Sequence, residues 1–169
     1  MSKNRFVKFS MFFLCLLMVG VTSCTKSKTQ RMQEAEKADR AKYLKENNIS
    51  PEARTLSGLY YVEDEAGEGD LPQYGDRVQV WYTGTFLDGE QFDSNEENGR
   101  FEPLTVFIGS GGGTIQGMIE GVAKMKKGGK ATLIIPSSLG YGSMGTYGIA
   151  PYTTLVFKVE VHDIIRAEQ

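Results

Sequence analysis

The sequence predicts an α+β domain in which an antiparallel sheet of five or six strands wraps around one short helix. Runs of β-forming residues with period-two alternation recur from residue 59 to residue 165. Only one stretch between these runs, residues 114–130, has helical spacing. Glycines outnumber prolines by 20 to 5, which favours tight turns between strands. One helix among so many strands indicates an antiparallel sheet packed on that helix.

The N-terminal segment is predicted to be a targeting sequence. Three basic residues precede an uncharged apolar run, Phe9 to Val21, whose 13 residues are fewer than the roughly 20 that a spanning helix needs. This layout is typical of a secretory signal peptide. The run ends in Val21-Thr22-Ser23-Cys24, which resembles the lipobox of bacterial lipoproteins. We therefore expect residues 1–23 to be a lipoprotein signal peptide and Cys24 to be lipidated; the alternative is a plain signal peptide with an incidental cysteine.

A lipidated tether is predicted for residues 24–57. Thr25, not Asp, follows Cys24, and by resemblance to lipoprotein sorting signals this favours the outer membrane, with the domain in the cell envelope facing the periplasm. From Thr25 to Asn48, helix-forming residues dominate and the apolar stripe is thin. A solvated, partly helical tether is expected, with a dimerising helix as the alternative.

The expected strands follow in chain order. They occupy residues 59–65, 77–86, 104–109, 130–136 and 153–165. In the second run, Val78, Val80 and Tyr82 alternate with their neighbours and share one face. The pair Asp88-Gly89 predicts a type I′ hairpin turn. In the last run one face carries four apolar residues: Leu155, Phe157, Val159 and Val161.

The single helix is predicted from apolar residues at i, i+3, i+4 and i+7. They are Ile115, Met118, Ile119, Val122 and Met125. Lysines at 124, 126 and 127 are expected at its C-terminal end, and the glycines at 128 and 129 are expected to stop it.

Composition and motifs argue against several function classes. A net charge of −2 gives no basic footprint for nucleic acid. Both cysteines, Cys15 and Cys24, precede the folded part, and the one histidine, His162, is expected at the surface or a strand end. The glycine-rich residues 109–117 match neither the dinucleotide fingerprint nor the P-loop. No metal and no cofactor are expected.

Several blocks resemble the FKBP-type peptidyl-prolyl cis-trans isomerases. The block "GDRVQVWYTGTFLDGEQFDSN" is similar to the family run V-x-Y-T-G…D-G-x-x-F-D-S. "FIG", "IQGMIEGVAKMKKGGKATLIIPSSLGYG" and "IAPYTTLVFKVEV" follow in the family's order. The resemblance runs from about Gly75 to Ile164, with a weaker lead-in strand from Gly58, so residues 58–169 are predicted to be the isomerase domain. It implies an antiparallel half-barrel of five or six strands around a short helix.

The resemblance also implies a pocket between the concave face of the sheet and the loops. The catalytic positions carried over are Tyr82, Phe92, Asp93, Ile115, Tyr141 and Phe157, with Leu104, Val106, Met118 and Ile149 as further substrate-binding residues. The Ile115 N–H and the Tyr141 hydroxyl are the implied donors to substrate carbonyls. Met118 stands where the best-known members have Trp, and Ala150 replaces one Pro of a frequent Ile-Pro-Pro loop. These departures bear on macrolide inhibitors more than on activity.

The implied reaction is rotation about X–Pro bonds of polypeptides in the envelope, without covalent chemistry. Such a bond rotates slowly because of its partial double-bond character, and an apolar pocket that removes water from the carbonyl favours the twisted amide. Asp93 is expected to act by hydrogen bonding or its local field; the alternative is a turn-capping role. The alternative function is a peptide-binding chaperone with little or no catalysis, which Met118 and Leu104 favour.

Overall fold

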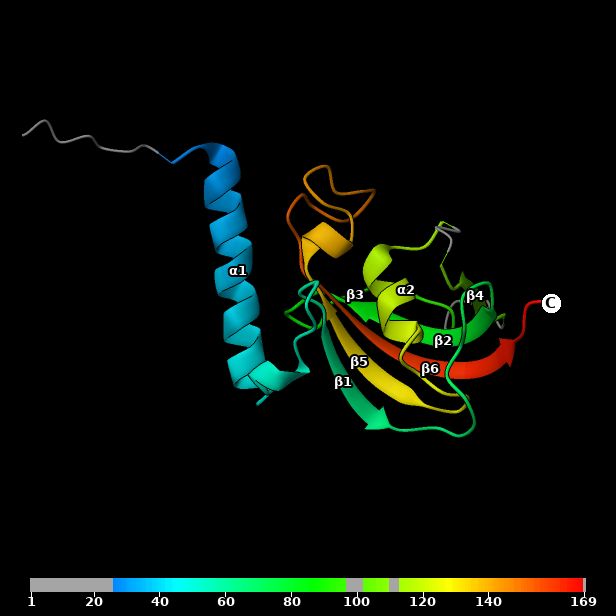
Figure 1. Ribbon diagram of the computed structural model, residues 1–169. Helices are drawn as coiled ribbons and strands as arrows, with labels where there is room; N and C mark the ends of the chain where they lie inside the picture. Colours follow the sequence, from blue (N-terminus) through cyan, green and yellow to red (C-terminus); the bar gives the residue numbers. More distant parts are fainter. Residues whose placement is uncertain (1–25, 97–101, 110–112, 169) are drawn as a thin grey trace, which may run out of the picture.

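The computed structural model contains one six-stranded antiparallel sheet that curves around a short helix (Figure 1). It describes residues 26–96, 102–109 and 113–168. The strands are β1 (Tyr60–Glu65), β2 (Arg77–Thr85), β3 (Gln91–Ser94), β4 (Leu104–Phe107), β5 (Lys130–Ile135) and β6 (Leu155–Ile165), and the helices are α1 (Lys28–Glu46) and α2 (Gln116–Val122) with short 3₁₀ turns η1 (Pro51–Ala53) and η2 (Ser137–Leu139). The predicted fold class is confirmed. The expected signal peptide and Cys24 lie outside the described residues.

The sheet order is β1-β5-β6-β2-β3, with β4 also paired to β2. β2 and β6 are the longest strands, and they pair along the whole of β2. The apolar face predicted for the last strand is confirmed, because Leu155, Phe157, Val159 and Val161 are all buried. These residues share one hydrophobic core with Met118, Ile119 and Val122 of α2, and burial of this core favours the fold.

α2 lies unusually close to the sheet because two of its residues are glycines. A Cβ on Gly117 would come within 2.5 Å of Ile135, and one on Gly121 within 2.4 Å of Leu133. Non-bonded carbon atoms do not approach so closely, so any larger residue at these positions would push the helix away from β5. The apolar stripe predicted for this helix faces the core, where Met118 is 2% exposed.

The helix is shorter than expected. α2 ends at Val122, so the lysines at 124, 126 and 127 follow the helix and do not cap its last turn. Tighter turns continue the chain, with Lys124 N–H donating to Gly121 and Met125 N–H to Val122 at 3.0 Å. The Met125 side chain is nevertheless buried, as it would be in a longer helix. The spacing of apolar residues therefore predicted a helix that includes position 125.

The hairpin between β2 and β3 does not contain the predicted type I′ turn. Such a turn needs positive φ at both central residues, but only Gly89, at φ 92°, has it; Asp88 does not. Phe86 N–H donates to the Glu90 carbonyl at 2.8 Å, and Gly89 N–H donates to the Phe86 carbonyl at 3.1 Å. The connection is therefore a three-residue loop that ends on a left-handed glycine.

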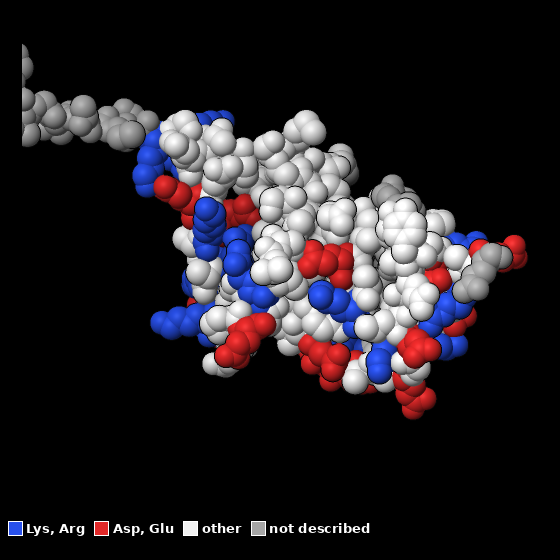
Figure 2. All heavy atoms as spheres, viewed as in Figure 1, with Lys and Arg blue, Asp and Glu red and all other residues white. Residues whose placement is uncertain are grey.

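α1 confirms the helix expected in the tether, but not its complete solvation. No residue of α1 is classed as buried, and Ser27 caps its first turn in a capping box with Gln30. On one side, however, Glu36 contacts Ser137 and Arg40 contacts Thr154 of the sheet domain, with the side chains of Glu36 and Arg40 9% and 16% exposed. The exposed remainder of the helix carries polar and charged residues (Figure 2).

A buried carboxylate fixes the far end of the domain. Asp76 is 3% exposed and accepts hydrogen bonds from the backbone N–H of Gln73 at 2.8 Å and of Ala167 at 2.9 Å. Arg166 donates to it at 2.7 Å. These two backbone donors, and then the guanidinium, lower the pKa of Asp76 below its ordinary value. The chain after β6 is thereby tied to the start of β2.

Candidate functional site

Phe92 occupies a β-bulge in β3. Gly84 pairs with Asp93, but Thr85 pairs with Gln91, so Phe92 has no partner of its own on β2. Consecutive side chains of a regular strand point to opposite faces, whereas a bulge re-aims one of them. This explains how Phe92 and Asp93, adjacent in sequence, both reach contacts with the same group of aromatic residues.

Four aromatic rings meet at this bulge. The Phe92 ring lies 5.5 Å from the Phe157 ring at 84° and 5.1 Å from the Phe86 ring. The Tyr82 ring lies 5.8 Å from the Phe157 ring. These edge-on and tilted arrangements are favourable for aromatic pairs. The predicted positions 82, 92 and 157 are therefore brought together, and Phe86 joins them although it was not predicted.

Gly84 makes this cluster possible. A Cβ at this position would lie 2.7 Å from Cζ of Phe92 and 3.0 Å from Cε1 of Phe157. The two rings thus occupy the space above the backbone of β2 that a side chain would fill. Gly84 was not among the predicted site residues, although a glycine inside a strand signals a close approach.

The polar part of the site consists of Tyr82, Asp93 and Tyr141. The Tyr82 hydroxyl donates to Oδ2 of Asp93 at 2.7 Å, and the Ser94 backbone N–H donates to Oδ1 at 3.0 Å. Asp93 therefore contacts Tyr82 of the site and also accepts a hydrogen bond from a neighbouring backbone N–H, which is the contact expected for the alternative turn-capping role. Burial raises the pKa of Tyr141, and the nearby negative charge of Asp93 raises it further. The Tyr141 hydroxyl consequently keeps its proton at neutral pH and can donate a hydrogen bond.

The remaining predicted residues pack in the same hydrophobic core as this cluster. Val106, Met118 and Ile149 are buried at 0%, 2% and 6% exposure, and Leu104 and Ile115 are partly buried against them. Ile115 is the N-cap residue of α2, with φ −64° and ψ 146°. Its side chain packs on the core where the chain turns into the helix.

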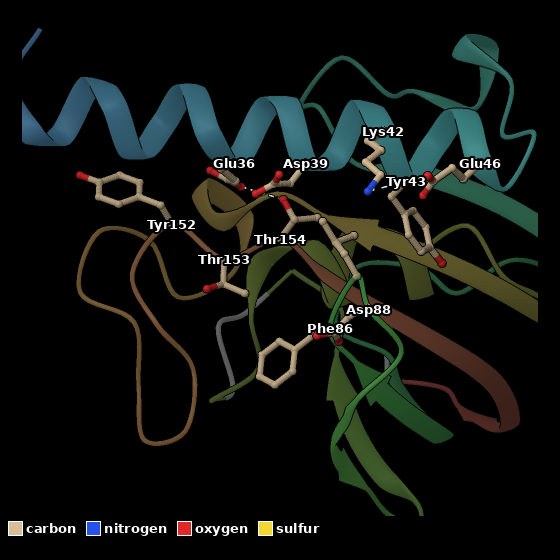
Figure 3. A pocket seen from close by; sticks show the side chains of 11 residues that line it. Glu36, Asp39, Lys42, Tyr43, Glu46, Phe86, Asp88, Tyr152, Thr153 and Thr154 are labelled. Atoms are coloured by element: carbon tan, nitrogen blue, oxygen red, sulfur yellow. Dashed lines mark hydrogen bonds and ion pairs between the residues drawn. The ribbon is translucent and has the colours of Figure 1, made fainter.

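A hollow of about 450 Å³ lies between α1 and the β2–β3 hairpin, beside the aromatic cluster (Figure 3). Asp39, Lys42 and Tyr43 line it from the helix, and Phe86 and Asp88 line it from the hairpin. Phe86 thus contacts both this groove and the Phe92 ring. The groove exists because α1 is held against the domain.

The residues that the structure describes contain no group of three His, Cys, Asp or Glu side chains able to hold a metal ion. His162 is exposed on β6, and its ring lies 5.8 Å from that of Trp81, as expected for a surface residue. Within the same residues, no helix is long and apolar enough to span a membrane.

The family model described as "FKBP-type peptidyl-prolyl cis-trans isomerase" matches residues 69–162. The chain belongs to this family. The match covers every strand of the FKBP domain except β1 and the end of β6. The aromatic cluster, Asp93 and Tyr141 all lie inside it.

Similar proteins include other FKBP-type isomerases of bacteria. FkpA of Escherichia coli K12 is 40% identical over 147 residues, which are 82% of this chain and 52% of the relative. The FKBP-type 22 kDa isomerase of the same organism is 41% identical, covering 80% of this chain and 64% of the relative. A crystal structure of a peptidyl-prolyl cis-trans isomerase from Pseudomonas syringae pv. tomato superposes with a TM-score of 0.66 at 28% identity, covering 84% and 99% of the two chains. The chain spans about half the length of FkpA.

Proposed function

We propose that this chain is a peptidyl-prolyl cis-trans isomerase that accelerates rotation about X–Pro bonds in polypeptides. The observation that carries the proposal is the aromatic cluster of Tyr82, Phe92 and Phe157, built on the β3 bulge and bordered by Asp93. Family membership supports it independently.

The pocket acts without breaking a bond. Rotation about the amide has a barrier of about 18–20 kcal/mol, because resonance gives the C–N bond double-bond character. The twisted amide has less charge separation than the planar one, so an apolar site stabilises it relative to the planar substrate. The proline ring binds against Phe92 and Phe157, which pack on the hydrophobic core that contains the buried Met118 and Val106.

Polar groups at the rim orient the substrate backbone. The Tyr141 hydroxyl stays protonated and donates to a carbonyl next to the proline. The backbone N–H of Ile115, at the start of α2, binds a second carbonyl. Asp93 holds the Tyr82 hydroxyl, and its negative charge acts on the amide through space. No proton transfer is needed in this mechanism.

A peptide assay tests the activity. A proline peptide whose trans form alone is cut by a protease reports the cis-to-trans rate, and the protein is expected to raise it. Phe92→Ala and Asp93→Leu are expected to lower kcat/KM, whereas Phe107→Ala, which changes an aromatic 38% exposed on β4, is the matched control. A wild-type rate equal to the uncatalysed one refutes the isomerase proposal. Undiminished rates in both pocket variants refute the site.

A peptide-binding chaperone is the second candidate function, and one surface favours it. Residues 131–157 contain no charged side chain, and within them Met144 and Tyr147 are 88% and 103% exposed. Figure 2 shows the uncharged surface above the sheet. Apolar side chains exposed next to a binding pocket suit unfolded polypeptide. Suppression of aggregation of a proline-free unfolded protein, lost in Met144→Ser with Tyr147→Ser, would support this function.

The cellular location is proposed from the leader sequence alone. We infer a lipid anchor at Cys24 that holds the domain at the outer membrane facing the periplasm, where its substrates are envelope proteins with X–Pro bonds. Cys24→Ser is expected to release the protein from the membrane fraction and to abolish labelling by a radioactive fatty acid. Labelling that persists in this variant contradicts the anchor. Protease digestion of intact cells separates the periplasmic from the external face.

Macrolide inhibitors remain a proposed class of ligand. Met118 fills the floor position with a flexible side chain, so the pocket is less rigid there than with Trp. Weaker inhibition by a macrolide in the wild type than in Met118→Trp is the expected result.

A further inference from the structure

One carboxylate on the tether helix contacts both ends of a loop of the isomerase domain. The connection between β5 and β6, residues 136–154, is called the flap below. Glu36 accepts hydrogen bonds from the backbone N–H and the hydroxyl of Ser137, both at 2.7 Å. It also accepts one from the hydroxyl of Thr154 at 2.9 Å. Ser137 lies at the beginning of the flap and Thr154 at its end, and Figure 3 shows Glu36 beside Thr154.

The Glu36 carboxylate is almost enclosed. Its side chain is 9% exposed, and Ser137 and Thr154 are 5% and 2% exposed. Arg40, one turn further along α1, donates to it at 3.0 Å and to the Thr154 hydroxyl at 2.9 Å. A buried charge is retained only where it is paired and hydrogen-bonded, and here both conditions hold. This set of contacts differs from the other described ion pairs of α1, which are exposed.

Glu36 also supplies an acceptor that the flap lacks. Ser137 is the first residue of η2, so its N–H has no acceptor within that turn, and Glu36 accepts it. Within the flap, Gly142 N–H donates to the Ser137 carbonyl at 2.8 Å, and Tyr152 N–H donates to the Gly142 carbonyl at 2.9 Å. The contacts of Glu36 therefore continue through short backbone bonds to the residue next to Tyr141.

The flap carries two residues of the proposed pocket. Tyr141 is four residues beyond Ser137, and Ile149 is five residues before Thr154. The tight turn between them is closed by hydrogen bonds between Thr146 and Ile149 at 2.9 and 3.0 Å. A shift at either end of the flap would consequently move the Tyr141 hydroxyl relative to the pocket.

We propose that Glu36 is a positioning residue for isomerisation. It holds both ends of the flap on α1 and so sets the position of the Tyr141 hydroxyl at the pocket rim. The inference rests on the proposed isomerase function. It gives the tether helix a role in the reaction in addition to its role as a spacer.

The test compares substitutions on the same helix in the full chain. Glu36→Ala removes all four contacts, whereas Glu36→Gln keeps one acceptor oxygen and can donate to the Ser137 hydroxyl. Glu34→Ala is the matched control, because Glu34 is on the same helix with its side chain 53% exposed in an ion pair with Lys26. We expect kcat/KM for an X–Pro peptide to fall about tenfold in Glu36→Ala, the factor of one oriented hydrogen bond. Glu36→Gln should recover part of this loss, and Glu34→Ala should lose nothing.

A double-mutant cycle with Tyr141→Phe shows whether the effect passes through the hydroxyl. We expect Glu36→Ala to have little further effect when the hydroxyl is already absent. A full additional tenfold loss in that background, or a wild-type rate in Glu36→Ala, overturns the proposal. Equal losses in Glu34→Ala and Glu36→Ala overturn it as well.

Amide hydrogen exchange provides a measurement that does not depend on activity. We expect residues 136–154 to exchange faster in Glu36→Ala than in the wild type and in Glu34→Ala. Unchanged exchange there overturns the inference, whatever the activity. An inactive wild type instead refutes the proposed function, so the two failures are distinguishable.

Discussion

An alanine at position 84 is the smallest change that tests how the pocket is built. Gly84 lies in β2 with no positive φ, so the backbone accepts alanine there. The new methyl group would lie 2.7 Å from Phe92 and 3.0 Å from Phe157. Ordinary carbon–carbon contacts are about 3.5–4.0 Å, so the Phe92 ring must move by about 0.8 Å.

This displacement acts on both stability and rate. Overpacking of this size lowers the free energy of unfolding by about 1–3 kcal/mol. A misplacement of about 1 Å at a site can cost up to about 100-fold in rate, so kcat/KM is expected to fall about 10- to 100-fold.

Denaturant unfolding and the protease-coupled peptide assay measure the two effects on one sample. Leu59→Ala serves as the control, because Leu59 is 0% exposed and precedes β1, at the edge of the sheet farthest from β3. It should cost about 2–5 kcal/mol of stability and leave kcat/KM of the folded protein unchanged. Wild-type kcat/KM in Gly84→Ala would show that the two rings do not need the space above this glycine.

Three further predictions concern single polar groups. Tyr82→Phe removes the hydroxyl that donates to Asp93. Because Asp93 is exposed, kcat/KM should fall only about two- to tenfold. An unchanged kcat/KM in the peptide assay would show that this hydrogen bond does not contribute to catalysis. The pKa of Asp76 is lowered by two backbone N–H donors and then by Arg166, so its contribution to stability is present above its unfolded pKa of about 3.9 and is lost as the pH falls through the lower folded value. Asp76→Asn should lower Tm at neutral pH and flatten the acid loss, and equal Tm–pH curves for both proteins would contradict this. The pKa of Tyr141 is raised above its ordinary value of about 10, so kcat/KM should stay level from about pH 6 to pH 9. A decline of kcat/KM within that range that disappears in Tyr141→Phe would contradict a protonated Tyr141 donor.

Five of the six strands and the buried stripe of α2 could be predicted because both depend on apolar periodicity within a few residues. β3 was not among the expected runs, because it has only four residues and a bulge interrupts its pairing with β2. The end of α2 could not, since turns after Val122 bury Met125 as a longer helix would. The turn type at Asp88-Gly89 failed for a related reason. A three-residue loop and a two-residue loop use the same residue pair, and only the register with β2 separates them.

The candidate site could also be predicted only in part. Tyr82, Phe92 and Phe157 were predicted from a family resemblance, and their rings do meet. The bulge that turns Phe92 toward Phe157 depends on pairing between strands, which the sequence does not display. Glu36 lies more than 100 residues from its partners, and nothing in the polar pattern of its helix distinguishes it from the exposed acids beside it.

Exchange spectroscopy by NMR detects rotation of the X–Pro bond and the site of binding in one experiment. With a proline peptide in excess, the wild-type protein should produce cis/trans exchange peaks that are absent without it. The peptide should also shift the ring resonances of Phe92 and Phe157. Phe92→Ala, folded by circular dichroism, should lose the exchange peaks while Phe107→Ala keeps them. Exchange of equal strength in Phe92→Ala would refute the proposed site, and no exchange in the wild type would refute the proposed activity.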